Sequence, residues 1–225
     1  MLSFFIDKEL FLSQTVFMAE SSIETKNKLL ESAKKEFLEK GFTAASLRKI
    51  AANAGVTTGA MYRHFKDKDS FFCALVDDAI ETTKKLVMLA DSSNHENLSF
   101  SKIKEHIDAE KKSIVGFLDY MYQNFDLFTL LLTKSAGSTH EYFQEDICEL
   151  YTENCKKTFD LMYDQKIIAK RVSQMTIHFM ASTVINAFCD IILHKMPKKE
   201  AVQYVADIMD FTSSGMYALF GIQKS

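Results

Sequence analysis

Apolar residues recur at intervals of three and four along nearly the whole chain, and no long stretch alternates with the two-residue period of a β-strand. Such spacing places apolar side chains on one face of an α-helix. The first segment of this kind covers residues 23–40, and its face contains Leu30, Ala33 and Phe37. Gly41 follows in the position of a helix C-cap. The pattern therefore predicts an all-α protein, with about nine helices in total.

Two very short helices and one longer helix are predicted next, over residues 46–53, 58–64 and 69–90. Apolar residues gather on one side of the longer helix, which predicts that this side is buried; they are Phe71, Phe72, Leu75 and Ala79. The polar stretch 91–101 predicts a loop.

The second half of the chain predicts further helices. Ser138 and Glu141 have the spacing of a capping box and predict a helix from there to about Tyr163. The last two helices, over 172–194 and 198–220, are separated near Pro197, and the first of them is apolar on more than one flank, as at a subunit interface. A short apolar helix over 126–134 comes before the helix that starts at Ser138. It is itself preceded by a longer helix, whose apolar stripe contains Ile103, Ile107, Ile114, Leu118, Met121 and Phe125.

Composition narrows the class of protein. Of the 225 residues 47% are hydrophobic and 25% are charged, and no uninterrupted apolar run approaches the length of a membrane span, so we expect no membrane partner. The four cysteines lack C-x-x-C spacing, which favours free thiols in a reducing compartment. The first residues lack the basic region and cleavage site of a secretory signal, which favours a cytoplasmic protein. Residues 1–20 are interpreted as an N-terminal extension, and Met18 resembles a natural translation start, which would place 1–17 upstream of it.

Charge is divided unevenly along the chain. Residues 21–70 contain ten Lys or Arg and six Asp or Glu, a net charge of +4, although the whole chain has a net charge of −3. An excess of this sign in a small N-terminal domain favours contact with a polyanion by that domain alone. We therefore expect a small domain over residues 21–68 that meets a polyanion and a second domain over 69–225, joined by the helix 69–90.

The segment "SLRKIAANAGVTTGAMYRHF" meets the physical demands of a helix-turn-helix. Ala51 is small enough for two helices to cross closely, and Gly55 tolerates the left-handed backbone of the turn. Thr57 can cap the next helix, which leaves Thr58, Gly59 and Ala60 on its first turn, where a recognition helix meets base edges.

This segment resembles the DNA-binding region of the TetR family of bacterial transcriptional regulators. The family pattern is "GF", then "IA..AGV", then "G..Y.HF..K", and it is found here from Gly41 to Lys68. The agreement covers about residues 28–76 and is closer than a lone helix-turn-helix pattern would be. It implies a three-helix DNA-binding domain followed by a larger helical domain.

The resemblance implies roles for individual residues. Ser46 and Arg48 would approach the DNA from the front of the second helix, and Arg48 could reach a guanine in the major groove. Base edges would be met by Thr58, Gly59 and Ala60, next to the capping residue Thr57, which is also counted among the DNA-binding residues. Phosphates would be held by Tyr62, His64 and Lys68.

For the second domain, the resemblance implies a homodimer formed through the last two helices and a pocket for a small-molecule effector. Aromatic and thioether side chains suit an apolar or aromatic effector. The candidate pocket residues are Phe117, Tyr120, Met121, Phe125, Phe128, Tyr151, Phe159, Met175 and His178.

Enzyme chemistry has little support in the sequence. His106 with Glu110 and Asp190 with His194 are i, i+4 pairs, but neither has a third metal ligand at a recognisable spacing, and no phosphate or dinucleotide fingerprint occurs. We therefore expect no cofactor and a transcriptional repressor that a small molecule releases from a palindromic operator. Two alternatives stay open: an effector-independent architectural or division-linked DNA-binding protein of the same fold, and an all-helical enzyme or receptor.

Overall fold

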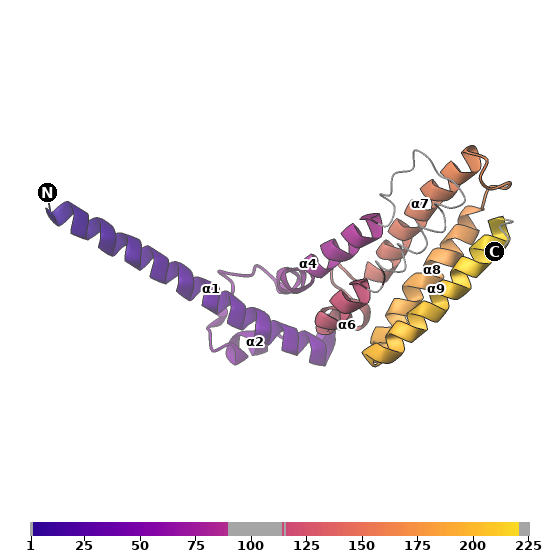
Figure 1. Cartoon of the computed structure of the whole chain (residues 1–225). Coiled ribbons are helices and arrows are strands. Elements are labelled where there is room, and N and C mark those ends of the chain that lie inside the picture. Colours follow the sequence, from indigo (N-terminus) through magenta and orange to yellow (C-terminus); the bar gives the residue numbers. More distant parts are fainter. Residues whose placement is uncertain (1, 90–113, 115, 221–225) are drawn as a thin grey trace. The chain divides into compact units, whose positions relative to one another are not determined.

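The computed structural model describes residues 2–89, 114 and 116–220, and within them the side chains of residues 21–88, 114 and 116–220. Over these residues every regular element is an α-helix (Figure 1), which confirms the predicted fold class. The predicted loop 91–101 and the stripe from Ile103 to Ile107 lie outside the described residues, as does the His106/Glu110 pair. The chain forms two compact units, which we call unit 1 (Met1–Leu75 with Lys134–Thr139) and unit 2 (Val76–Thr133 with His140–Ser225).

Unit 1 contains three complete helices and the first two turns of a fourth. They are α1 (Leu2–Ala44), α2 (Leu47–Asn53), α3 (Thr58–Met61) and α4 (Lys68–Leu89), of which residues up to Leu75 belong to this unit. The predicted break at Gly41 is confirmed, because its φ of 74° and ψ of 165° interrupt the helical backbone of α1. Helix α3 is shorter than the predicted 58–64.

An aromatic cluster forms much of the core of unit 1. The rings of Phe37, Phe42 and Phe72 pack with centroid distances of 5.4 to 5.9 Å. The rings of Phe65 and Phe71 stack at 3.8 Å. Around them lie the buried side chains of Leu29, Ala33, Ile50, Ala51 and Met61. The predicted apolar faces of the first helix and of the helix 69–90 thus meet through Phe37 and Phe72.

The segment Lys134–Thr139 joins unit 1 although it follows α6 in the sequence. The Phe42 amide donates to the carbonyl oxygen of Lys134 at 2.8 Å, and the Thr43 hydroxyl donates to that of Ala136 at 2.7 Å. The Thr139 amide donates to Asp69 Oδ1 at 2.9 Å. These bonds satisfy backbone groups next to the helix break at Gly41.

Unit 2 is built from the rest of α4, a helical stretch over 116–123, and helices α6 (Phe125–Thr133), α7 (Phe143–Asp164), α8 (Gln174–Leu193) and α9 (Lys198–Phe220). Helices α7 and α8 lie side by side, as do α8 and α9 (Figure 1). The last two helices begin and end within two residues of the predicted bounds. Helix α8 is capped by Ser173, whose Oγ accepts from the Thr176 amide at 3.1 Å.

The predicted capping box at Ser138 is wrong. Helix α7 begins after Tyr142, which makes no side-chain capping bond. Ser138 is buried, and its amide donates to the Ser135 carbonyl oxygen at 2.8 Å within the segment that packs in unit 1. Tertiary contacts of this segment have overridden the local capping signal.

Helix α8, with 20 residues, lies within the predicted range 172–194 and is strongly apolar. By length and composition alone it could cross a membrane, with a mean hydropathy of 1.5. Its buried positions, which include Ile177, Val184 and Ile191, pack within unit 2, where α8 contacts α6, α7 and α9. Only part of the helix is buried in this way, because 39% of its most apolar stretch is buried within the protein.

Replacing Gly41 tests the helix break. Gly41→Ala should lower the free energy of unfolding by about 1–3 kcal/mol, because a φ of 74° strains any residue with a Cβ. Gly116→Ala is the matched control. Gly116 is helical, and outside its own helix no atom of the described residues lies within 4 Å of the position that an alanine methyl would take, so alanine should raise the free energy of unfolding by up to about 1 kcal/mol. Urea unfolding followed by circular dichroism measures both, and equal stabilities of Gly41→Ala and wild type would contradict the account.

Candidate nucleic-acid interface and apolar cavity

Helices α2 and α3 and the turn between them form a compact motif in unit 1. The Ser46 hydroxyl accepts from the Lys49 amide at 3.4 Å and caps α2. Gly55 takes a φ of 70° in the turn, and the Val56 amide returns to the Ala51 carbonyl oxygen at 3.0 Å. The Thr57 hydroxyl accepts from the Ala60 amide at 3.1 Å and caps α3, as predicted from the sequence. Both helices therefore begin at fixed positions.

A buried carboxylate on α1 holds α2 in place, and we did not identify it from the sequence. Glu36 is only 3% exposed, and its Oε1 accepts from the Ser46 amide at 3.3 Å. Its Oε2 lies 2.9 Å from Lys49 Nζ, and this hydrogen bond raises the pKa of Lys49. The buried Ser32 hydroxyl adds a bond to the Ile50 carbonyl oxygen at 2.8 Å. Three polar contacts thus fix α2 against α1.

Most of the predicted base-reading residues of this motif are accessible to solvent. Arg48, Thr57, Thr58 and Gly59 are exposed, and Ala60 is half-buried. No described residue forms an ion pair with Arg48 within 4 Å. Small side chains at the start of α3 allow its backbone to approach a partner closely.

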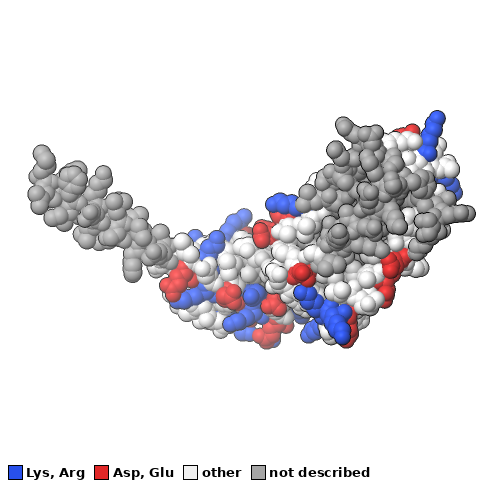
Figure 2. All heavy atoms as spheres, in the orientation of Figure 1, with Lys and Arg blue, Asp and Glu red and all other residues white. Residues whose placement is uncertain are grey.

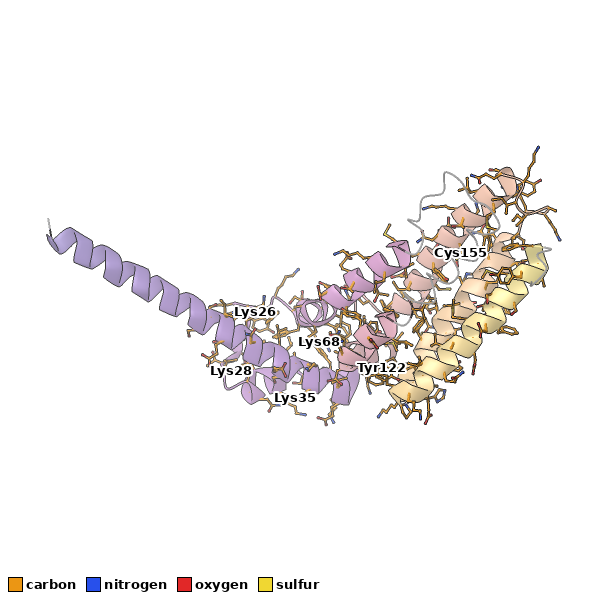
Figure 3. All side chains as sticks on the ribbon, viewed as in Figure 1. Lys26, Lys28, Lys35, Lys68, Tyr122 and Cys155 are labelled. Atoms are coloured by element: carbon orange, nitrogen blue, oxygen red, sulfur yellow. The ribbon has the colours of Figure 1, made fainter. Side chains whose placement is uncertain are left out.

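The predicted phosphate-binding residues are arranged less uniformly. Tyr62 is 52% exposed and His64 is half-buried. Lys68, at the start of α4 (Figure 3), donates from Nζ to the carbonyl oxygens of Thr43 at 2.8 Å and Ala45 at 3.3 Å. Its ammonium also lies 5.0 Å from the centre of the Phe42 ring. Lys68 is therefore a cap for the end of α1, with one N–H left for another acceptor.

Basic and acidic side chains are interleaved on the face of the molecule seen in Figure 2. Several lysines of α1 have acidic neighbours: Lys28 lies 2.7 Å from Glu24, and Lys34 lies 3.7 Å from Glu31. Such exposed pairs contribute little to stability and exchange partners readily. The net charge of +4 over residues 21–70 does not form one continuous patch on this face.

Unit 2 contains an apolar cavity of about 100 Å³, which we call the larger cavity. None of its described lining residues carries a charge. Four of the nine candidate pocket residues line it, namely Phe117, Met121, Phe128 and Tyr151. The other lining residues are Thr83, Leu86, Val87, Ile114, Leu132, Phe143, Gln144, Ile147, Val184, Ile185, Phe188 and Cys189.

The other five candidates do not line the larger cavity. Phe159 lines a separate cavity, and Phe125 packs 5.7 Å from the Tyr122 ring. The Tyr120 ring lies 6.1 Å from that of Phe128. Met175 is 75% exposed, and His178 is exposed with Nδ1 3.3 Å from the Thr152 hydroxyl. Helical spacing identified these residues as apolar or amphipathic positions, but it does not distinguish the flank of a helix that faces a cavity.

The polar groups of the cavity lining are mostly engaged by the protein. The Thr83 hydroxyl donates to the Ala79 carbonyl oxygen at 2.7 Å, and Gln144 Nε2 donates to Asn186 Oδ1 at 2.9 Å. Burial raises the pKa of Cys189 to about 12, so this thiol stays protonated at neutral pH. Such a lining favours an uncharged ligand, because an unpaired charge there would lose its hydration.

Large apolar side chains also remain exposed on α8 and α9. They include Met175, Phe179, Leu193, Val202, Phe211 and Leu219, with exposed fractions between 38% and 75%. An apolar surface of this extent is typical of an interface.

The part of the chain that contains the helix-turn-helix is similar in sequence to known transcriptional regulators. Residues 29–75 match the family described as bacterial regulatory proteins, tetR family. The HTH-type transcriptional repressor BepR of Brucella suis is 36% identical over 74 residues, which are 33% of this chain and 35% of BepR. The chain thus matches about a third of the length of that curated relative.

Solved structures of similar fold cover more of the chain. NalD, the secondary repressor of the MexAB-OprM multidrug efflux pump in Pseudomonas aeruginosa, has a TM-score of 0.58 at 19% identity, over 86% of this chain and 97% of NalD. The SmeT–triclosan complex has a TM-score of 0.59 at 16% identity, over 85% of this chain and 90% of SmeT. At these identities the likeness concerns the fold.

The capping role of Lys68 predicts a loss of stability on its removal. Lys68→Ala should lower the free energy of unfolding by about 1–2 kcal/mol, because two carbonyl oxygens lose a charged donor. Lys66→Ala, at a side chain that is 90% exposed, should change it by less than about 0.5 kcal/mol. Chemical denaturation of both variants measures the difference, and equal values would show that the Lys68 contacts contribute nothing.

Proposed function

Because residues 29–75 match the family described as bacterial regulatory proteins, tetR family, we propose that the protein is a cytoplasmic transcriptional repressor of this family rather than an enzyme. It binds a palindromic DNA operator as a homodimer and is released by a small, largely apolar or aromatic effector. The observation that carries this proposal is the helix-turn-helix of unit 1, in which two capped helices present Arg48 and a row of small residues to solvent.

DNA recognition uses two kinds of contact. Arg48 reads a guanine, and Thr58 and Gly59 bring the backbone of α3 close to base edges. Ser46 and Thr57 lie at the N-termini of α2 and α3, and Tyr62, His64 and the remaining N–H of Lys68 hold phosphates. Because the residues on α3 are small, Arg48 and the shape of the DNA supply much of the specificity.

The exposed apolar side chains of α8 and α9 support a homodimer. Burying residues such as Phe179 and Phe211 against a second copy removes a large apolar area from water. Two recognition helices can enter successive major grooves only when they are about 34–36 Å apart. The dimer therefore sets the spacing of the half-sites.

The larger cavity supports a neutral effector. Its described lining has no charge. The side-chain nitrogen of Gln144 already donates to Asn186, and the side-chain carbonyl oxygen of Gln144 is the acceptor that we assign to the ligand. SmeT, which shares the fold, was solved with triclosan. An aromatic or alkyl molecule with one hydroxyl or amide donor would fit this lining.

Helix α4 supports coupling between ligand and DNA. Its residues Phe71 and Phe72 belong to the core of unit 1, and Thr83, Leu86 and Val87 line the larger cavity. A ligand that contacts the second half of α4 differently in two arrangements of the dimer shifts the equilibrium between them. An effector-independent DNA-binding protein would have no need of such a cavity.

Substitution of Arg48 and Lys68 tests the DNA contacts. On a duplex selected from a random library, Arg48→Ala should lose about 1–3 kcal/mol of discrimination at one base pair. Lys68→Ala should weaken all duplexes and reduce the slope of log affinity against log salt by about 0.9.

The matched control for both variants is Lys85→Ala, which removes the same charge from an exposed position of unit 2. It should leave both the discrimination and the salt slope unchanged in fluorescence anisotropy titrations. Identical behaviour of all three variants would contradict the assigned roles.

Thermal shift tests the ligand cavity. A small apolar probe such as n-hexanol should raise the melting temperature of the protein as its concentration exceeds the dissociation constant, because it binds only the folded state. Ile147→Trp, which fills the larger cavity, should abolish this rise. Sodium hexanoate, of similar length but charged, should have no effect, and equal shifts with both probes would contradict a neutral site.

A further inference from the structure

A second and smaller cavity, of about 30 Å³, lies beside the larger one in unit 2. Helices α7, α8 and α9 each contribute three residues to its lining: Tyr151, Cys155 and Phe159; Met180, Ala181 and Val184; and Met209, Thr212 and Met216. Tyr151 and Val184 also line the larger cavity. The two cavities therefore share a wall that is made of these two side chains.

The cavities follow one another along the same pair of helices. On α7, the larger cavity is lined from Phe143 to Tyr151 and the smaller one from Tyr151 to Phe159. On α8, the order is reversed, with Cys189 at one end and Met180 at the other. The sixteen steps along the helix from Phe143 to Phe159 correspond to roughly 24 Å at 1.5 Å per residue. A molecule that occupied both cavities would lie along α7 and α8.

The smaller cavity has a deformable lining. Three of its nine lining residues are methionines and one is Cys155, which Figure 3 labels on α7. Unbranched thioether side chains change rotamer easily and can admit additional atoms. The Thr212 hydroxyl donates to the Ile208 carbonyl oxygen at 2.9 Å, so the one hydroxyl from α9 in this lining is already bonded within its helix. No described lining residue is charged.

The size of the larger cavity sets a limit on what it holds alone. An apolar cavity of about 150 Å³ in another protein holds one benzene molecule. At about 100 Å³, the larger cavity is smaller than that and has room for a short chain. A longer ligand needs more space, and the smaller cavity lies behind Tyr151 and Val184.

We propose that the two cavities form one elongated binding site for a neutral molecule with an unbranched apolar chain, and that Tyr151 and Val184 determine the chain length that is accepted. The polar end of the molecule donates to the carbonyl oxygen of Gln144, and the chain passes Tyr151 into the methionine-lined cavity. This inference rests on the proposed function, in which the larger cavity is the effector site.

A homologous series of alcohols tests the proposal on the full-length protein. Isothermal titration calorimetry with n-hexanol, n-octanol and n-decanol should show an affinity that rises about fourfold for each added methylene group through the whole series. Ala181→Leu places a larger side chain in the smaller cavity only, because Ala181 does not line the larger one. In this variant n-hexanol should bind as in wild type, and the rise should stop at n-octanol.

A second variant acts in the opposite direction and covers the case in which Ala181→Leu fails to fold. Tyr151→Ala removes most of the shared wall and should favour n-decanol over n-hexanol more strongly than wild type does. If the affinity of wild type stops rising at n-octanol and neither variant changes the series, the elongated site is wrong while the effector cavity stands. If n-hexanol does not bind either, the proposed effector cavity is wrong as well.

Discussion

The orientation of the DNA-facing motif depends on the buried carboxylate of Glu36. One oxygen accepts from the backbone amide of Ser46, where α2 begins, and the other pairs with Lys49 one turn later. A buried carboxylate without such partners would be costly, so the favourable arrangement of α1 and α2 is narrowly defined. Because α3 follows α2 after a short turn, Glu36 also constrains the helix that we propose to meet the bases. The same carboxylate leaves Arg48, on the outer side of α2, exposed.

In unit 2 the constraint is a surplus of apolar side chains, because not all of them are buried in a close-packed core. Part of this apolar surface lines the two cavities, to which both α7 and α8 contribute, and part stays exposed on α8 and α9. Interiors are normally packed without voids of this size, so cavities with continuous apolar linings are a reason to expect a ligand. The exposed part is a reason to expect a second subunit. Helix α4 supplies residues both to the core of unit 1 and to the lining of the larger cavity.

Local signals in the sequence predicted much of the fold. The spacing of apolar residues identified the helices of the second half of the chain. In the first half, Gly41 marked the break in α1 and Thr57 marked the start of α3, because a left-handed backbone favours glycine and an N-cap favours a hydroxyl side chain. Ser138 and Glu141 carried a similar trace and misled us, since Lys134–Thr139 is held by contacts with residues about 70 to 90 positions away. Long-range contacts of this kind have no local signature. The contacts of Lys68 and the exposure of Met175 could not be predicted for the same reason. The residues next to Lys68 in the sequence do not indicate that it caps carbonyl oxygens at the end of α1, and those next to Met175 do not indicate that it lies on an exposed flank of α8.

The central claim is that occupancy of the cavity and affinity for DNA are coupled. By thermodynamic linkage, a ligand that weakens DNA binding must itself bind more weakly to the DNA complex, and by the same factor. The most direct measurement is calorimetric titration of n-octanol into the protein alone and into its complex with a selected operator duplex. The account predicts that the complex binds n-octanol more weakly by about 5–150-fold, matched by the loss of DNA affinity at saturating n-octanol. Equal affinities of the free and DNA-bound protein for n-octanol would contradict it.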